Sequence, residues 1–198
     1  MNHIFESIPG WFTFPELYKS IVNHYPDNSH FVEIGAWKGR SAAYMAVEII
    51  NSGKQIQFDI IDTWKGSEEH LDPTQPAHEP GLLQDSDYIW KEFNNNIQPV
   101  IEYIKPIRMP SLEAVKLYED ESLDFVFIDA SHDYENVFKD VEAWWPKIKS
   151  ETGVLAGHDY AWGPEVKAAV DDFFTPLGLQ IQEQEGCWVV VKATNNVL

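Results

Sequence analysis

The segment 31–41 constrains the fold of this 198-residue chain more than any other. A short apolar run at its start leads into a turn that contains Gly35 and Gly39, and a helix-favouring run at 41–50 follows at once. This order predicts a β-strand, a glycine turn and a helix N-terminus, the local geometry that receives a small ligand beyond the end of a parallel strand. Glu33 precedes the turn, where a carboxylate near backbone N–H groups suits a ligand that carries both an ammonium and a carboxylate.

Along the rest of the chain, apolar runs typical of strands alternate with runs of helical periodicity. We expect parallel strands at 31–34, 57–62, 101–107, 124–128 and 153–157. We expect helices at 14–25, 41–50, 89–97, 111–115, 137–148 and 164–173, and a closing hairpin formed by 177–182 and 187–192. The alternation predicts one α/β domain, 1–198, with a doubly wound, mostly parallel sheet and a C-terminal antiparallel hairpin.

Three local features refine this expectation. Thr13, three residues before Glu16, has capping-box spacing, and Ser111 is placed to cap a later helix. Pro106 lacks a backbone donor, which makes the 101–107 strand a candidate for the sheet edge. Residues 64–86 are rich in Gly, Pro, His and acidic residues with little periodicity, so we expect a lid or substrate loop within the domain.

The charge of the chain narrows its partners. Asp and Glu total 32 against 14 Lys and Arg, a net charge of -18. Nucleic acids and anionic membranes are bound through cationic side chains, so we expect neither as a partner. The single cysteine, Cys187, and an N-terminus without signal-peptide character predict a cytoplasmic protein. A homo-oligomer is left open.

Polar residues and glycines gather where the predicted strands end. In open α/β sheets, ligands bind beyond the carboxyl ends of the strands. The five strand ends supply, in chain order, Glu33, Gly35, Trp37, Gly39 and Ser41; Asp62 and Trp64; Ser111; Asp129 and His132; and His158 and Asp159. Because these ends meet at one edge of a parallel sheet, the set predicts a ligand site there.

Asp62 helps to identify the ligand. A carboxylate at the end of the second strand, about 29 residues after Glu33, can accept both hydroxyls of a ribose, although a turn aspartate is the alternative. A dinucleotide site needs the spacing G-x-G-x-x-G. Here Trp37 occupies the place of the second glycine and would obstruct a pyrophosphate. The turn favours a nucleoside cofactor that carries an amino acid.

Three phrases carry a family resemblance, namely VEIGAWKGRS at 32–41, FIDASHDY at 127–134 and GVLAGHDY at 153–160. With them the chain resembles class I S-adenosylmethionine-dependent methyltransferases over residues 8–192. It is most similar to a small bacterial group found beside sugar and natural-product biosynthesis enzymes, and more distantly to catechol O-methyltransferase. The resemblance implies a Rossmann-like, seven-stranded sheet and S-adenosylmethionine as cofactor.

The resemblance implies a part for each residue of the cofactor site. Glu33 and Ser41 would hold the amino and carboxylate ends of the methionine moiety, Gly35 would let that moiety approach the backbone, Asp62 would bind the ribose, and Ser111 would lie near the adenine. Trp37 falls where the catechol enzymes carry a tyrosine near the methionine moiety, and a packing role is equally expected. Gly39, Trp64 and Asp129 complete the expected cofactor site.

The resemblance also implies a metal and a base. Asp129 and Asp159 match the two metal-binding aspartates of the catechol enzymes, whereas Tyr160 stands where asparagine is expected, so His158 is the candidate third ligand. This donor set suits Mg²⁺, Mn²⁺ or Zn²⁺. His132 stands where those enzymes place a catalytic lysine, and it can accept a hydroxyl proton near neutral pH. His158 is the competing base, and a structural role is the alternative for His132.

Together these features predict an S-adenosylmethionine-dependent O-methyltransferase with a small hydroxylated acceptor, such as a sugar or a natural product. Asp129 is also a candidate catalytic residue, and whether a metal assists the reaction is left open by the sequence. Two alternatives stay open from the sequence. They are an NAD-dependent oxidoreductase on a similar sheet and a non-catalytic binding protein that retains the fold.

Overall fold

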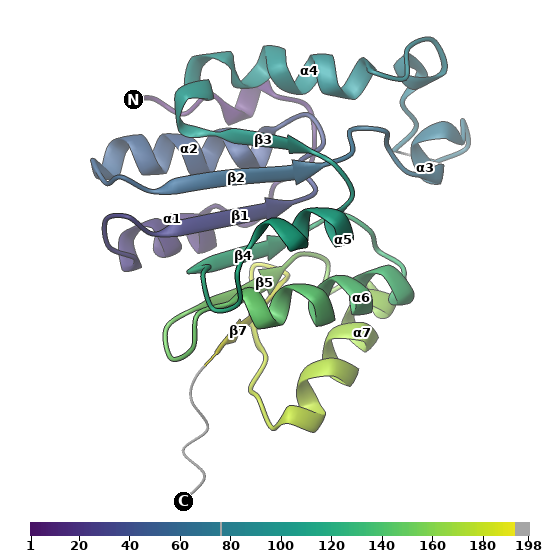
Figure 1. Cartoon of the computed structure of the whole chain (residues 1–198). Helices are drawn as coiled ribbons and strands as arrows, with labels where there is room; N and C mark the ends of the chain where they lie inside the picture. The colour runs from purple at the N-terminus through teal and green to yellow at the C-terminus, as the bar shows by residue number, and fades with distance from the viewer. Residues whose placement is uncertain (76, 193–198) are drawn as a thin grey trace, which may run out of the picture.

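A seven-stranded sheet forms the centre of the computed structural model, which describes residues 1–75 and 77–192 (Figure 1). The strand order is β3-β2-β1-β4-β5-β7-β6. The parallel strands are β1 (His30–Ile34), β2 (Gln57–Asp62), β3 (Lys105–Arg108), β4 (Phe125–Ile128) and β5 (Val154–Gly157). β7 (Cys187–Val191) runs antiparallel to both β5 and β6 (Gln182–Gln184). The predicted doubly wound sheet with a C-terminal hairpin is confirmed. The expected bounds of the first hairpin strand, 177–182, are wrong, because pairing with β7 starts only at Gln182.

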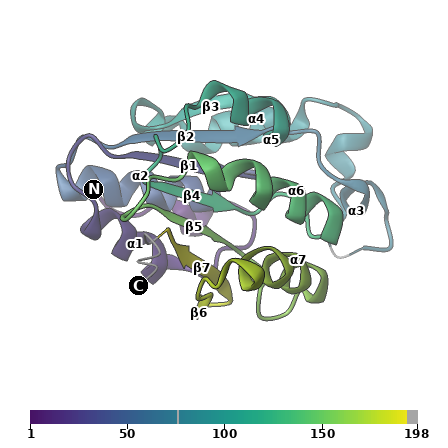
Figure 2. The same cartoon turned by 60° about the horizontal axis from the view of Figure 1, so that its bottom comes forward.

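Helices cover both faces of this sheet (Figure 2). One face carries α1 (Pro15–His24), α2 (Arg40–Ser52) and α4 (Tyr88–Ile97), and the other carries α5 (Ser111–Ala114), α6 (Tyr134–Trp144) and α7 (Pro164–Phe174). Alternate residues of β1 enter the two cores, with Phe31 on the first face and Val32 on the second. Burial on both faces explains why the central strands are almost continuously apolar.

The register of the three central strands brings their carboxyl ends level. Ile34, the last residue of β1, lies between Ile61 of β2 and Ile128 of β4. Asp62 and Asp129 therefore leave the sheet on either side of the glycine turn. The strand order reverses between β1 and β4, because β2 and β3 lie on one side of β1 and β4 and β5 lie on the other. α/β sheets bind ligands at such a point.

Both expected hydroxyl caps are wrong, because each hydroxyl has a tertiary partner. α1 follows Phe14 with Pro at its start and has no side-chain cap. The Thr13 hydroxyl instead lies 2.9 Å from Nε2 of His158. Similarly, α5 has no side-chain cap, and Ser111 Oγ accepts a hydrogen bond from Trp144 Nε1 at 2.8 Å.

The third strand is shorter than expected. Residues Gln98–Tyr103 form a 3₁₀ helix, and pairing with β2 starts only at Lys105. Pro106 lies in this strand, which is at the edge of the sheet as predicted. No helix among residues 1–75 and 77–192 is long and apolar enough to cross a membrane.

The 64–86 segment contains local structure that its sequence did not predict. It forms a short helix, α3 (Glu68–Leu71), and a 3₁₀ turn, Pro80–Leu83, and α3 lies beyond the arrowhead of β2 (Figure 1). The imidazole of His70 stacks on Trp37 with ring centroids 3.9 Å apart. Lys38 forms an ion pair with Glu79. The glycine turn and this segment are therefore in direct contact.

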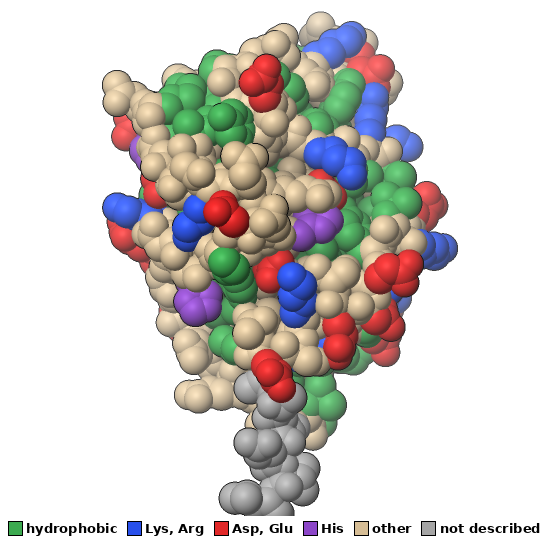
Figure 3. Space-filling view, turned by 60° about the vertical axis from the view of Figure 1, so that its left-hand side comes forward, with side chains coloured by type: hydrophobic (Ala, Val, Ile, Leu, Met, Phe, Trp, Pro, Cys, Tyr) green, Lys and Arg blue, Asp and Glu red, His purple; other side chains and the backbone are tan. Residues whose placement is uncertain are grey.

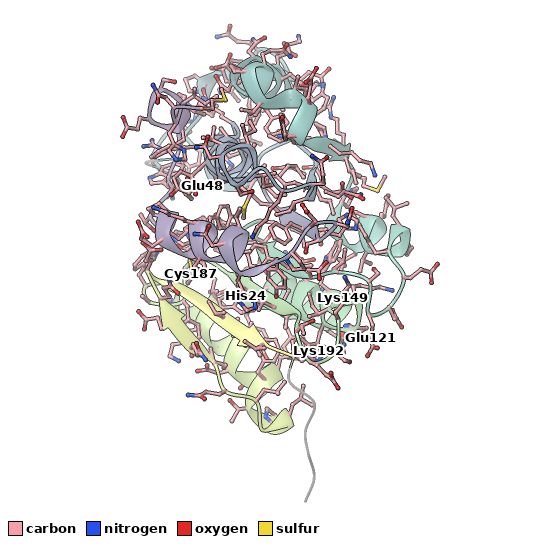
Figure 4. The ribbon with its side chains drawn as sticks, turned by 90° about the vertical axis from the view of Figure 1, so that its left-hand side faces the viewer. His24, Glu48, Glu121, Lys149, Cys187 and Lys192 are labelled. Carbon is pink, nitrogen blue, oxygen red and sulfur yellow. The ribbon has the colours of Figure 1, made fainter. Side chains whose placement is uncertain are left out.

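The opposite edge of the sheet, where the parallel strands begin, is closed by ion pairs. Figure 4 views this edge and shows Lys149, Lys192 and Glu121 side by side. Lys149 Nζ lies 2.9 Å from both carboxylate oxygens of Asp124, which also accepts from the backbone N–H of His30. Charges of both signs are interspersed over this side of the molecule (Figure 3). These contacts give this edge a structural role and leave the carboxyl edge for ligand binding.

Candidate functional site

A cavity of about 860 Å³ opens at the carboxyl edge of the sheet. Its walls come from the ends of β1, β2, β4 and β5, from the starts of α2 and α6, and from the segment before α1. Small-molecule sites are typically roughly 300–1,000 Å³, so this cavity has room for a nucleoside cofactor and a second small molecule.

Gly35 allows the first strand to leave the sheet close to β4. Its φ is +86°, and a Cβ built on it would lie 2.1 Å from the carbonyl oxygen of Asp129. Gly39 has a different role, because its φ of +88° starts α2 and a Cβ there would meet Ile97 and Phe93 at 2.9 and 3.0 Å. Gly35 lines the cavity, whereas Gly39 packs α2 against α4 behind the cavity wall.

Asp62 organises the glycine turn. Its Oδ2 accepts from the backbone N–H groups of Ala36 at 2.8 Å and Trp37 at 3.1 Å, and its Oδ1 accepts from Trp64 at 2.7 Å. Burial raises the pKa of Asp62, although these N–H donors oppose the shift. The side chain lines the cavity. The turn role that the sequence left as an alternative is therefore present, and binding of a ribose is an additional proposal.

Glu33 lies behind the cavity wall and is only 1% exposed. It accepts a hydrogen bond from the hydroxyl of Ser41, which does line the cavity, and its Oε2 has no partner among the described residues. Burial raises the pKa of Glu33 to about 8. The proton of the Ser41 hydroxyl is thus directed at Glu33 and away from the cavity.

Trp64 and Trp37 connect the cavity to the surrounding core. Trp64 is completely buried, packs against Trp90 and Phe93, and donates from Nε1 to the carbonyl oxygen of Trp37 at 3.0 Å. Both tryptophans line the cavity. Trp37 has a φ of +48°, an unusual value for a bulky residue, and Asp62 supports it through the backbone bond described above.

Two aspartate and two histidine side chains meet at the cavity wall that the ends of β4 and β5 form. His158 Nδ1 lies 3.7 Å from Asp129 Oδ1 and 3.4 Å from Asp159 Oδ1. His132 Nε2 lies 2.9 Å from Asp159 Oδ2 and 3.8 Å from Asp129 Oδ1. Ligand atoms of Asp129, His158 and Asp159 all lie within 4.8 Å of one another. Two carboxylates and one imidazole fit a divalent cation such as Mg²⁺, Mn²⁺ or Zn²⁺.

The electrostatics of this cluster favour the charged forms. Hydrogen bonds to Asp129 and Asp159 raise the pKa of His132 to about 10. Burial would lower the pKa of His158, but the Asp159 hydrogen bond and the Asp129 charge outweigh it and raise the pKa. Burial would also raise the pKa of Asp159, yet its bonds to both imidazoles hold the pKa well below the usual range. These carboxylates therefore favour the protonated form of His132.

The sequence analysis missed two charged residues that line the cavity, Arg40 and Asp140. Asp140 is buried on α6. Burial raises its pKa to about 6, although a hydrogen bond with Ser111 opposes this shift. It interrupts the apolar stripe of Val137, Val141 and Trp144, which is a signal that periodicity could have given. Arg40 begins α2, where a cation is unfavourable because of the helix dipole.

Comparison with known proteins identifies the family. Residues 32–160, well over half of the chain, match a family model described as a methyltransferase domain. A search of curated protein sequences gives no match. The match supports a methyltransferase over the oxidoreductase alternative, and it spans the glycine turn and the acidic and imidazole cluster.

Solved structures of methyltransferases share the fold. The O-methyltransferase NovP has a TM-score of 0.67 at 16% identity, with 90% of this chain and 79% of that chain covered. A Podospora anserina methyltransferase bound to S-adenosylhomocysteine gives 0.56 at 16%, covering 89% and 76%. CalS11, a TDP-rhamnose 3′-O-methyltransferase of calicheamicin biosynthesis, gives 0.57 at 11%, covering 89% and 76%. With the family match, this fold shows that the chain belongs to the methyltransferase domain family and is a class I S-adenosylmethionine-dependent methyltransferase.

Proposed function

We propose that the chain transfers the methyl group of S-adenosylmethionine to a hydroxyl of a small, uncharged, ring-shaped acceptor, such as a sugar or a natural product. The observation that carries this proposal is the placement of Asp129, His158 and Asp159 in the same cavity as the glycine turn. A cation held by these three residues would orient the acceptor hydroxyl and lower its pKa.

The cofactor would lie along the wall of the cavity that contains the glycine turn. The expected cofactor residues that line the cavity are Gly35, Trp37, Ser41, Asp62, Trp64, Ser111 and Asp129. Asp62 would bind the ribose hydroxyls, and Ser111, which also lines the cavity, would lie near the adenine. Glu33 and Gly39 would act through Ser41 and the start of α2, since neither contacts the cavity.

Methyl transfer is an in-line displacement. An oxygen lone pair of the acceptor forms the new C–O bond, the C–S bond breaks with its electrons passing to sulfur, and the acceptor proton passes to a base. Holding the oxygen, methyl carbon and sulfur in line supplies much of the rate enhancement. We assign the base to His132, which is 47% exposed, because His158 is buried between Thr13 and the two aspartates.

Two exposed tryptophans support a ring-shaped acceptor. Trp11 is 64% and Trp162 is 57% exposed, and both line the cavity. The Trp162 indole is fixed, because Nε1 donates to Asp159 and the ring lies over Gly186, where a Cβ would be 2.2 Å away. Flat apolar faces of this kind stack on saturated or aromatic rings. The sugar ring named for CalS11 agrees with a ring-shaped acceptor, but that acceptor carries an anionic diphosphate, which the acidic cluster of this chain disfavours.

Calorimetry tests the cofactor, and a methyl-transfer assay tests the acceptor. S-adenosylhomocysteine should release heat on binding, and Asp62→Ala should weaken that binding. A panel of neutral glycosides and catechols with tritiated S-adenosylmethionine and Mg²⁺ or Mn²⁺ should yield a methylated product. No binding of either cofactor form at millimolar concentration overturns the proposal. Methylation of anionic acceptors alone overturns the acceptor class.

A further inference from the structure

The hydroxyl of Thr13 is released from the helix-capping role that its spacing from Glu16 predicts. α1 has no side-chain cap from the residues that precede it. The backbone N–H of Leu17, in the first turn of α1, donates instead to Glu185 Oε2 at 2.9 Å. This N–H is one that a capping side chain normally satisfies. Glu185 lies in the turn between β6 and β7, so the C-terminal hairpin supplies the acceptor and the Thr13 hydroxyl is left for another contact.

The Thr13 hydroxyl is joined to the proposed cation site through His158. Thr13 Oγ1 lies 2.9 Å from Nε2 of His158, and both residues line the cavity. The other ring nitrogen, Nδ1, lies 3.4 Å from Asp159 Oδ1 and 3.7 Å from Asp129 Oδ1. The imidazole is buried, and the ring of Phe14 lies 4.9 Å from it. Its two nitrogens therefore have separate surroundings, with Nε2 at Thr13 and Nδ1 at the carboxylates.

The chemistry of metal ligation decides which nitrogen of His158 must carry the proton. A histidine binds a metal through a nitrogen lone pair, so ligation between the two carboxylates requires Nδ1 without a proton. A neutral imidazole then carries its proton on Nε2, the nitrogen that faces Thr13. The hydroxyl oxygen of Thr13 has lone pairs that can accept this hydrogen bond. Such bonds fix both the tautomer and the ring orientation of metal-binding histidines.

We propose that Thr13 is a positioning residue that holds His158 in the Nε2–H tautomer and so presents Nδ1 to the cation, which rests on the cation site of the proposed function. Thr13 itself touches neither the cation nor the reacting atoms in this role. Its influence should depend on the metal, because imidazole is a favourable ligand for Zn²⁺ whereas Mg²⁺ favours carboxylates and water. Loss of the Thr13 bond should therefore weaken Zn²⁺ more than Mg²⁺.

Thr13→Val provides the test, because valine has nearly the shape of threonine but cannot accept a hydrogen bond. Dissociation constants for Zn²⁺ and Mg²⁺ are measured by calorimetry on the full chain. Partners that orient a metal-binding histidine are worth roughly 10–100-fold in metal affinity, so Zn²⁺ should bind more weakly by this factor. Mg²⁺ should change by less than roughly threefold, because it depends mainly on the carboxylates.

The tautomer itself gives a second measurement that needs no Thr13 variant. In Zn²⁺-loaded wild type, long-range ¹H–¹⁵N spectra should place the ring proton of His158 on Nε2, with the signal assigned by its loss in His158→Gln. A proton on Nδ1 overturns the inference, whether or not Thr13→Val folds.

Thr13→Ser and Thr63→Val are the matched variants. Thr13→Ser keeps a hydroxyl and should restore Zn²⁺ affinity to within roughly threefold of wild type. Thr63 also lines the cavity, but it follows β2, which β1 and β4 separate from β5, so Thr63→Val should keep the Zn²⁺ affinity. Equal weakening of Zn²⁺ and Mg²⁺ in Thr13→Val, or unchanged Zn²⁺ binding, overturns the inference. If wild type binds neither cation, the cation site of the proposed function fails, and the role of Thr13 fails with it.

Discussion

Replacing Gly35 by alanine should damage both stability and the functional site. Its φ of +86° costs a residue with a Cβ about 1–2 kcal/mol. The new Cβ would lie 2.1 Å from the Asp129 carbonyl oxygen, a backbone atom that must retreat by about 1 Å to reach ordinary contact. Overpacking of this kind adds about 1–3 kcal/mol. We therefore expect a total loss of about 2–5 kcal/mol in the free energy of unfolding.

The displacement also predicts a loss of ligand binding. Asp129 belongs to the proposed cation site, and groups that orient ligands of a metal are worth roughly 10–100-fold in affinity. Gly35→Ala should therefore weaken Mn²⁺ and S-adenosylhomocysteine by about this factor in calorimetry, while urea unfolding measures its stability.

Gly53→Ala is the matched control for this experiment. Gly53 ends α2 with a φ of +70°, and nothing lies within 4 Å of a Cβ built there. It shares the backbone strain but not the clash, so it should lose about 1–2 kcal/mol and keep both affinities. If the two variants are equally stable and bind both ligands equally well, the reasoning about Gly35 is refuted.

Three further predictions concern buried and catalytic side chains. The pKa of about 8 at Glu33 means that the folded state holds a proton that the unfolded state has lost, so stability should fall as pH rises from about 4 to 8. Glu33→Gln should flatten this dependence in urea unfolding, and an unchanged slope would contradict the assignment. Tyr118→Phe removes a 2.9 Å hydrogen bond to buried Asp59 and should cost about 1.5–3 kcal/mol by the same method, whereas a loss near zero would show that the bond is not formed. His132→Ala should slow methyl transfer by roughly 10²–10⁴-fold with little change in S-adenosylhomocysteine affinity, and loss of cofactor binding would contradict its role as base.

Much of the fold follows from the sequence because apolar periodicity is a local signal. The order of strands and helices predicted a parallel sheet, and that sheet requires the ends of neighbouring strands to meet. Asp129, His132, His158 and Asp159 could therefore be grouped correctly although they are far apart in the chain. Their common edge is a property of topology and needs no knowledge of side-chain packing.

What the sequence did not predict depends on tertiary partners. Thr13 and Ser111 were expected to cap helices, but His158 and Trp144 compete successfully for their hydroxyls. Ser41 lines the cavity as expected, but its hydrogen bond to Glu33 on the preceding strand was not predicted.

The most direct test is a crystal structure with S-adenosylhomocysteine and Mn²⁺, with the metal located by anomalous scattering. The account predicts the ribose at Asp62 and one anomalous peak coordinated by Asp129, His158 and Asp159. S-adenosylhomocysteine outside the cavity, or no peak between these three side chains at saturating Mn²⁺, would contradict it.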